Sequence, residues 1–160
     1  MLDWERRAIG VQLGDAPHFV GTLSATYDPG RDTTGTAWWV TAFFAPEVWR
    51  RWGVGLLHGS LNLWLTASDG RVEIPGLQVK LPEEVLRQIQ PGHPDLARRW
   101  RQVSITPVLV AGEALGFVIR GSETPDTFVE VFAPTHLRTR LGIARNQKTP
   151  VQVGVLACDY

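Results

Sequence analysis

Ser60 and Asn62 are the residues whose types and spacing best suit them to bind a ligand or a metal. They lie in residues 58–65, where Gly59 is followed directly by alternating polar and apolar side chains. Side chains two positions apart on a strand point to the same face, so Ser60 and Asn62 share one face and the intervening leucines the other. Two oxygen-bearing side chains at the mouth of a strand are therefore well placed to meet a ligand or a metal.

The same two residues have a simpler role open to them. Ser and Asn side chains commonly hydrogen-bond backbone groups at turns, and residue type alone favours that role here. His58, beside Gly59, is likewise typical of a turn residue rather than of a catalytic base.

Other familiar catalytic signatures are absent from the sequence. It has no Gly-rich loop ending in Gly-Lys-Ser/Thr, which excludes a P-loop kinase on motif grounds, and no Gly-x-Gly-x-x-Gly after a strand. The four histidines are scattered without a pair at metal-binding helical spacing. The single cysteine, Cys158, has no neighbour in sequence that would activate its thiol.

Composition narrows the class of protein. The 160 residues suffice for one domain, and 16 basic against 16 acidic residues argue against nucleic-acid binding as the main function. One cysteine cannot form an internal disulfide, which predicts a reducing cytoplasm. No apolar run approaches a membrane span, and the charged N-terminus does not look like a signal peptide.

The elements that must position these residues are mostly short strands. Alternation, β-branched residues and turn signals predict strands over 19–27, 36–44, 61–66, 71–74, 102–110, 114–120, 127–133 and 150–156. Helical spacing and end signals predict short helices over 46–52, 82–90, 94–100 and 134–141. Many short strands in one chain must hide their edges, so we expect a mainly β fold closed into a barrel, with short inserted helices.

Particular side chains follow from these elements. On the predicted strand over 36–44, Trp38 and Trp39 are expected on opposite faces. On the helix over 46–52, the spacing predicts that Val48, Trp49 and Trp52 are buried. On the helix over 134–141, Arg138 and Arg140 are expected on a solvated face, with phosphate contact as the alternative.

Two segments taken together resemble a known family. The first runs from Trp52-Gly53 through a short spacer to Gly59-Ser60-Leu61-Asn62-Leu63, and the second is Val129-Glu130-Val131-Phe132-Ala133-Pro134 followed by Leu137-Arg138. In order and spacing they resemble the archaeal CTP-dependent riboflavin kinases, which have Gly-Thr-Leu-Asn-Leu, and later an acid-containing strand leading to Ala-Pro and Leu-Arg. The resemblance covers roughly residues 19–156.

The resemblance implies a fold and a reaction. The fold is a six-stranded type of cradle-loop β-barrel, here a single domain over residues 1–160 with an N-terminal extension (1–18) and an insertion (67–101). The reaction is transfer of a phosphate from CTP to riboflavin, which gives FMN and depends on Mg²⁺. Riboflavin, FMN and a nucleotide are the expected partners, with neither a nucleic acid nor a membrane among them.

The resemblance also implies roles for individual residues. Ser60, where the family has Thr, and Asn62 would hold Mg²⁺ near the nucleotide phosphates, and Glu130 would orient or deprotonate the accepting hydroxyl. Glu130 could equally be a solvent-facing strand residue. The residues expected to contact nucleotide or flavin are Gly35, Thr36, Trp38, Gly59, Ser122 and Thr124.

One loop departs from the family pattern. The family has a Gly-rich run followed by a cation and an aromatic residue, whereas residues 29–39 here keep the aromatic pair, lose most glycines and place Ala37 where the cation belongs. Arg31 could supply that charge from a differently shaped loop. The departure keeps two alternatives open: a flavin- or nucleotide-binding module without turnover, and an interaction barrel that uses its tryptophans as a surface.

Overall fold

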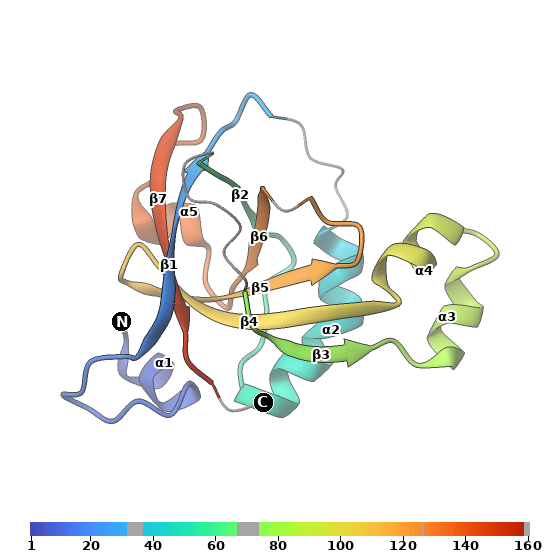
Figure 1. Cartoon of the computed structure of the whole chain (residues 1–160), viewed down its shortest axis with the longest axis horizontal. Helices are drawn as coiled ribbons and strands as arrows, with labels where there is room; N and C mark the ends of the chain where they lie inside the picture. The colour runs from blue at the N-terminus through green and yellow to red at the C-terminus, as the bar shows by residue number, and fades with distance from the viewer. Residues whose placement is uncertain (32–36, 67–73, 126, 159–160) are drawn as a thin grey trace.

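A computed structural model describes residues 1–31, 37–66, 74–125 and 127–158 (Figure 1). Its strands are β1 (Phe19–Tyr27), β2 (Leu61–Leu65), β3 (Leu77–Lys80), β4 (Gln102–Val110), β5 (Ala114–Gly121), β6 (Phe128–Phe132) and β7 (Thr149–Leu156). Its helices are α1 (Asp3–Ala8), α2 (Ala37–Trp52), α3 (Glu83–Ile89), α4 (Pro94–Trp100) and α5 (Leu137–Leu141).

Six of the strands close into an antiparallel barrel in the order β4-β5-β6-β2-β1-β7. Closure occurs because β4 pairs with β5 along its length and with β7 at its end, where Val108 lies opposite Val155. The start of β4 pairs instead with β3, which therefore lies outside the barrel. The prediction of a mainly β, six-stranded barrel with short helices is confirmed.

Two apolar clusters explain how the barrel is packed. One cluster takes buried residues from every barrel strand, including Leu61, Leu63, Val129 and Val131, and fills the interior. The other joins outward-facing residues such as Phe132 to α2, α3 and α4, which cover part of the outer surface. In Figure 1, α3 and α4 project away from the barrel, where β3 ends and β4 begins. Because side chains alternate along a strand, the polar partners of the inward-facing leucines on β2 lie on the outer face.

The prediction of a strand over 36–44 is wrong, because the described part of that segment belongs to the helix α2. Val40, Phe44, Val48 and Trp52 are buried, and their four-residue spacing forms one helical face against the barrel. Long-range packing of this stripe outweighs the β preference of the aromatic residues. The helix continues through Pro46, which lies inside it rather than near its start.

Two predictions about side chains in the α2 segment are wrong. Trp38 and Trp39 do not lie on opposite strand faces; they are neighbours on the helix, with ring centroids 4.9 Å apart. Trp49 is 64% exposed rather than buried.

The N-terminal extension and the insertion contain elements that the sequence did not predict. The helix α1 lies in the extension, and β3 lies in the insertion, close after the strand predicted over 71–74. Residues 71–73 of that predicted strand lie outside the described residues. Within the described part of the chain, no helix combines the length and apolar character needed to cross a membrane.

Candidate functional site

Ser60, Asn62 and Glu130 meet on the outer face of the barrel. Ser60 Oγ donates a hydrogen bond of 2.7 Å to Glu130 Oε1 and lies 3.3 Å from Asn62 Oδ1. The register of β2 and β6 causes this meeting, because Asn62 lies directly opposite Glu130. Leu61 and Leu63 point into the barrel. Because side chains alternate along a strand, Ser60 and Asn62 point outward.

Glu130 has an unusual environment for a carboxylate. It is only 6% exposed, so it is not a solvent-facing strand residue. Burial raises the pKa of its carboxyl group, and the hydrogen bond from Ser60 opposes that rise only in part. A carboxyl group whose pKa is raised accepts a proton from a hydroxyl group more readily than an ordinary carboxyl group.

Gly59 gives the chain its turn into β2. Its φ of +143° is a backbone conformation that residues with a Cβ rarely adopt, so glycine is required there. Gly59 also lines a hollow of about 180 Å³, which Thr135 and His136 border from the segment before α5.

A larger open cleft of about 770 Å³ is also lined by Ser60. Ser60, Leu61 and Arg138 line both hollows, so the cleft and the smaller hollow meet at these residues. The cleft is lined by Tyr27, Asp28, Pro29, Arg31, Ser60, Leu61, Asn62, Arg138, Arg145 and Asn146. Three arginines against one aspartate make its wall basic, which suits a phosphate-bearing ligand.

Arg31 supplies one of these charges from the loop after β1. Its guanidinium carbon lies 4.4 Å from the centroid of the Trp64 ring, and it also forms an ion pair of 3.6 Å with Asp28. Trp64 in turn contacts Phe128 across the strand pair, with ring centroids 4.9 Å apart. The aromatic pair therefore holds a cation at the rim of the cleft.

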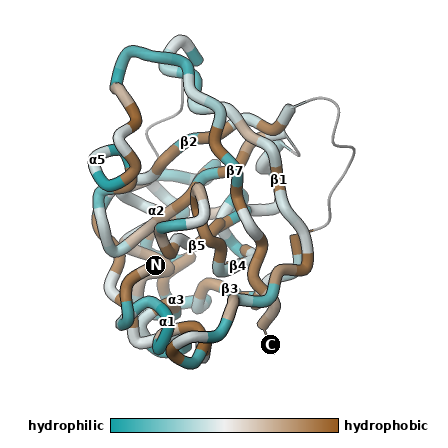
Figure 2. The backbone as a smooth tube through the Cα atoms, turned by 90° about the vertical axis from the view of Figure 1, so that its left-hand side faces the viewer, coloured by the Kyte–Doolittle hydropathy of each residue, from teal (hydrophilic) through white to brown (hydrophobic). Residues whose placement is uncertain are grey.

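Arg145 supplies a second charge from the hydrophilic loop between α5 and β7 (Figure 2). Tyr27 Oη donates a hydrogen bond of 2.8 Å to the carbonyl oxygen of Arg145, which anchors this loop to the end of β1. The sequence pattern suggested no role for this loop. A basic residue just before the last strand was the signal that could have identified it.

The two arginines of α5 have separate surroundings. Arg138 lines the cleft, and its contact with phosphate stays a prediction. The expectation that Arg140 is solvated is wrong, because it forms an ion pair with the fully buried Glu5. That partner lies 135 residues away in the sequence, so no local pattern could predict the contact.

The remaining predicted residues lie apart from this centre. Trp38 is on α2, 55% exposed, and stacks on His58 with ring centroids 6.4 Å apart, which places it next to the turn at Gly59. Thr124 Oγ1 accepts a hydrogen bond of 3.0 Å from Gly121 N and closes the turn after β5, where Ser122 is exposed.

Ser122 and Thr124 do not line the cleft or the smaller hollow. Gly35 and Thr36 lie outside the described residues.

The oxygen atoms of the site are chemically suited to a magnesium ion. Ser60 Oγ and Asn62 Oδ1 are hard oxygen ligands of the type that Mg²⁺ uses alongside phosphate oxygens and water. The described residues contain no cluster of three His, Cys, Asp or Glu that could hold a metal by themselves. Residues of this kind would bind Mg²⁺ together with a nucleotide rather than alone.

Neither a family model nor a curated protein matches the chain.

Proposed function

We propose that the protein is a Mg²⁺-dependent phosphotransferase that moves the γ-phosphate of a nucleotide to riboflavin and forms FMN. The observation that carries the proposal is the contact between Ser60 and Glu130, with Asn62 in register beside it. Ser60 and Asn62 line the basic cleft, and Glu130 lies behind them as the partner of Ser60. The sequence resemblance to the archaeal riboflavin kinases favours CTP as the phosphate donor and riboflavin as the acceptor. A reducing cytoplasm suits such an enzyme and the single thiol of Cys158.

The phosphate side of the reaction needs positioning and charge neutralisation rather than a covalent nucleophile. Arg31, Arg138 and Arg145 line the cleft and supply positive charge to a triphosphate. Ser60 and Asn62 supply the oxygen atoms that would hold Mg²⁺. When bound, the ion neutralises phosphate charge and orients the transferred group.

The acceptor side needs a group that takes up a proton. The terminal hydroxyl oxygen of the ribityl chain forms a bond to the γ-phosphorus, and the bond from that phosphorus to the β–γ bridging oxygen breaks. The nucleoside diphosphate leaves with the electron pair of the broken bond, and the hydroxyl proton passes to the carboxylate of Glu130. Burial raises the pKa of Glu130, which increases its tendency to accept that proton.

A second candidate is a flavin- or nucleotide-binding module on the same barrel without turnover. The specific observation in its favour is that Glu130 is 6% exposed and already bonded to Ser60, which limits the access of an acceptor hydroxyl. A third candidate, an interaction barrel, is favoured by Trp38 and Trp49, which are 55% and 64% exposed on α2.

A donor and acceptor screen separates these candidates. The purified protein is incubated with riboflavin, Mg²⁺ and each of CTP, ATP, GTP and UTP, and FMN is sought by chromatography. The proposal expects FMN with at least one donor and no FMN when Mg²⁺ is chelated. Quenching of riboflavin fluorescence without FMN formation supports the binding module. If neither flavin nor nucleotide raises the melting temperature, the interaction barrel is favoured.

A further inference from the structure

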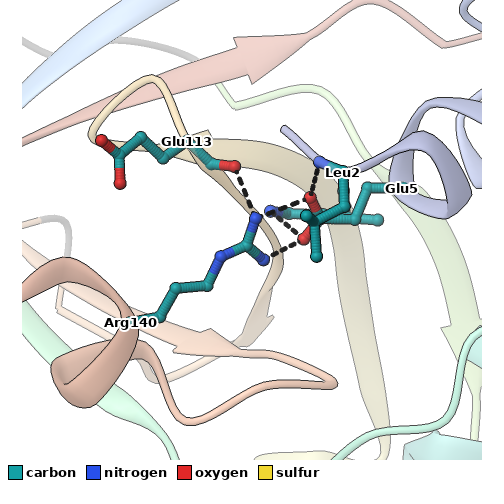
Figure 3. A network of polar contacts seen from close by, with 5 residues as sticks. Leu2, Glu5, Glu113 and Arg140 are labelled. Carbon is teal, nitrogen blue, oxygen red and sulfur yellow. Dashed lines mark hydrogen bonds and ion pairs between the residues drawn. The ribbon is translucent and has the colours of Figure 1, made fainter.

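Glu5 is a fully buried carboxylate far from the chemistry proposed above. It lies on α1 with 0% exposure, and it accepts hydrogen bonds from Leu2 N (2.8 Å) and Leu115 N (3.2 Å). Arg140 of α5 binds both of its oxygens and also donates a 2.9 Å hydrogen bond to the carbonyl oxygen of Glu113 (Figure 3). The network therefore joins three separate segments: α1, the β4–β5 turn and α5.

The helix α5 depends on such outside contacts for its orientation. It has only five residues, which is too short to be stable alone. Leu137 and Ile143 are buried in the cluster that fills the barrel, and Gly142 ends the helix with a φ of 67°. These apolar contacts fix where the helix lies, whereas the two-oxygen contact with Glu5 fixes the direction of Arg140.

The direction of Arg140 also fixes that of Arg138. Residues two apart on an α-helix point about 200° away from each other. Arg140 points to α1, so Arg138 points the opposite way, where it lines both the basic cleft and the smaller hollow beside Gly59.

We infer that Glu5 is a positioning residue: it holds α5 through Arg140 so that Arg138 faces a polyphosphate group bound in the cleft. The N-terminal helix is then part of the anion-binding apparatus rather than an appendage. The ligand class, a polyphosphate, rests on the proposed function, whereas the coupling of α1 to α5 rests on the contacts of Glu5 alone. A role limited to anchoring the N-terminus would require the same ion pair but would leave Arg138 unaffected.

A double-mutant cycle distinguishes positioning from anchoring, with inorganic tripolyphosphate and Mg²⁺ as the probe and calorimetry as the measurement. Glu5→Gln is expected to weaken tripolyphosphate binding about tenfold in the wild-type background, which corresponds to about 1.4 kcal/mol of binding free energy. In the Arg138→Ala background, Glu5→Gln is expected to have no further effect. Equal weakening in both backgrounds, or none in either, overturns the inference.

Glu47→Gln serves as the matched control. It breaks the exposed ion pair of Glu47 with Arg50 on α2, and neither residue lines the basic cleft. It is expected to leave tripolyphosphate binding unchanged. If Glu5→Gln fails to fold, Arg140→Lys keeps the charge and removes the two-pronged contact, and it takes the place of Glu5→Gln in the cycle.

Hydrogen exchange tests the coupling without any ligand. The backbone N–H of Arg140 donates to the carbonyl oxygen of His136, and that of Ile143 donates to the carbonyl oxygen of Arg138. In Glu5→Gln these two amides are expected to exchange at least tenfold faster, whereas the amide of Val118 in the barrel keeps its protection. Unchanged protection of α5 overturns the positioning role. If the wild-type protein binds no tripolyphosphate, the proposed function fails, and this exchange measurement still decides whether Glu5 orients α5.

Discussion

Ser60 Oγ donates a hydrogen bond to Glu130 Oε1 over 2.7 Å, and this contact joins residues 70 positions apart in the chain. It brings the residue directly before β2 to the buried carboxyl group of Glu130, which lies opposite Asn62 in the strand pair. The contact favours the ionised form of Glu130, while burial favours the neutral form. The proposed chemistry depends on the balance between these two effects.

Removal of the Ser60 hydroxyl is expected to alter the pH dependence of FMN formation. In Ser60→Ala the pKa of Glu130 should rise further, because burial is then unopposed by the hydrogen bond. The acidic limb of the pH profile of kcat/KM should move to higher pH, and the rate at pH 7 should fall on the order of tenfold. Ser104→Ala on β4, outside the cleft lining, is the control. An unchanged acidic limb in Ser60→Ala would contradict the assignment of Glu130 as the base.

Removal of the Asn62 amide is expected to abolish Mg²⁺-dependent nucleotide binding and leave the fold intact. Asn62 is half-buried at the cleft, so its truncation leaves no large cavity, and the change in the free energy of unfolding should be within about 1 kcal/mol. Nucleotide affinity is measured with Mg²⁺ and again with a chelator, beside the melting temperature. Gln102→Ala, an exposed position on β4, is the control. Equal affinity in Asn62→Ala and wild type would refute the metal role.

Replacement of Glu130 is expected to stabilise the protein while it removes activity. The pKa of Glu130 is raised in the folded state, so its stabilising contribution is present below the unfolded-state pKa and is lost as the pH rises through the folded-state pKa. Glu130→Gln should therefore increase the free energy of unfolding by about 1 kcal/mol at pH 8, with little change at pH 4. Urea denaturation at both pH values measures this difference. A loss of stability at pH 8 would mean that the ionised carboxylate stabilises the fold.

The ion pair of Glu5 predicts the opposite pH dependence. Burial raises the pKa of Glu5, but the hydrogen bonds from Arg140, Leu2 and Leu115 more than offset this and hold it below the usual range. Its contribution to stability is then present above the unfolded-state pKa and is lost as the pH falls through the lowered pKa. Glu5→Gln should cost about 3–5 kcal/mol at pH 7, because it leaves the partner charge uncompensated.

Urea denaturation from pH 7 downward tests the Glu5 prediction. The difference between wild type and Glu5→Gln should shrink as the pH falls, because the wild-type carboxylate then becomes protonated. A difference that stays constant with pH would show that the charge of Glu5 is not what stabilises the network.

Much of the barrel could be predicted because its strands carry local signals. Alternating residues and clear turns mark β1 and β4, whose predicted bounds match the structure. The prediction for the α2 segment was wrong because aromatic and β-branched residues favour a strand locally. The buried face of α2, with apolar residues four apart, is stabilised only by contact with the folded barrel. Closure itself depends on the pairing of β4 with β7, which no local pattern specifies.

The candidate site was predictable in its centre and not at its edges. Asn62 and Glu130 lie on the regular strands β2 and β6, where alternation determines the face of each side chain, and Ser60 directly precedes β2. Arg31 lies in a loop, and the sequence indicated it only as a possible source of positive charge. Arg145 lies in a loop for which the sequence suggested no role, and the contact between Glu5 and Arg140 joins distant parts of the chain. That contact depends on the tertiary fold, so residue type and spacing could not reveal it.

The central claim is tested most directly by the rate of FMN formation in wild type and Glu130→Gln, measured side by side with riboflavin, Mg²⁺ and the best donor nucleotide. The account predicts FMN from wild type, a fall of at least about 100-fold in Glu130→Gln, and unchanged nucleotide affinity in that variant. The absence of FMN from wild type with every donor at high protein concentration, or full activity in Glu130→Gln, would contradict it.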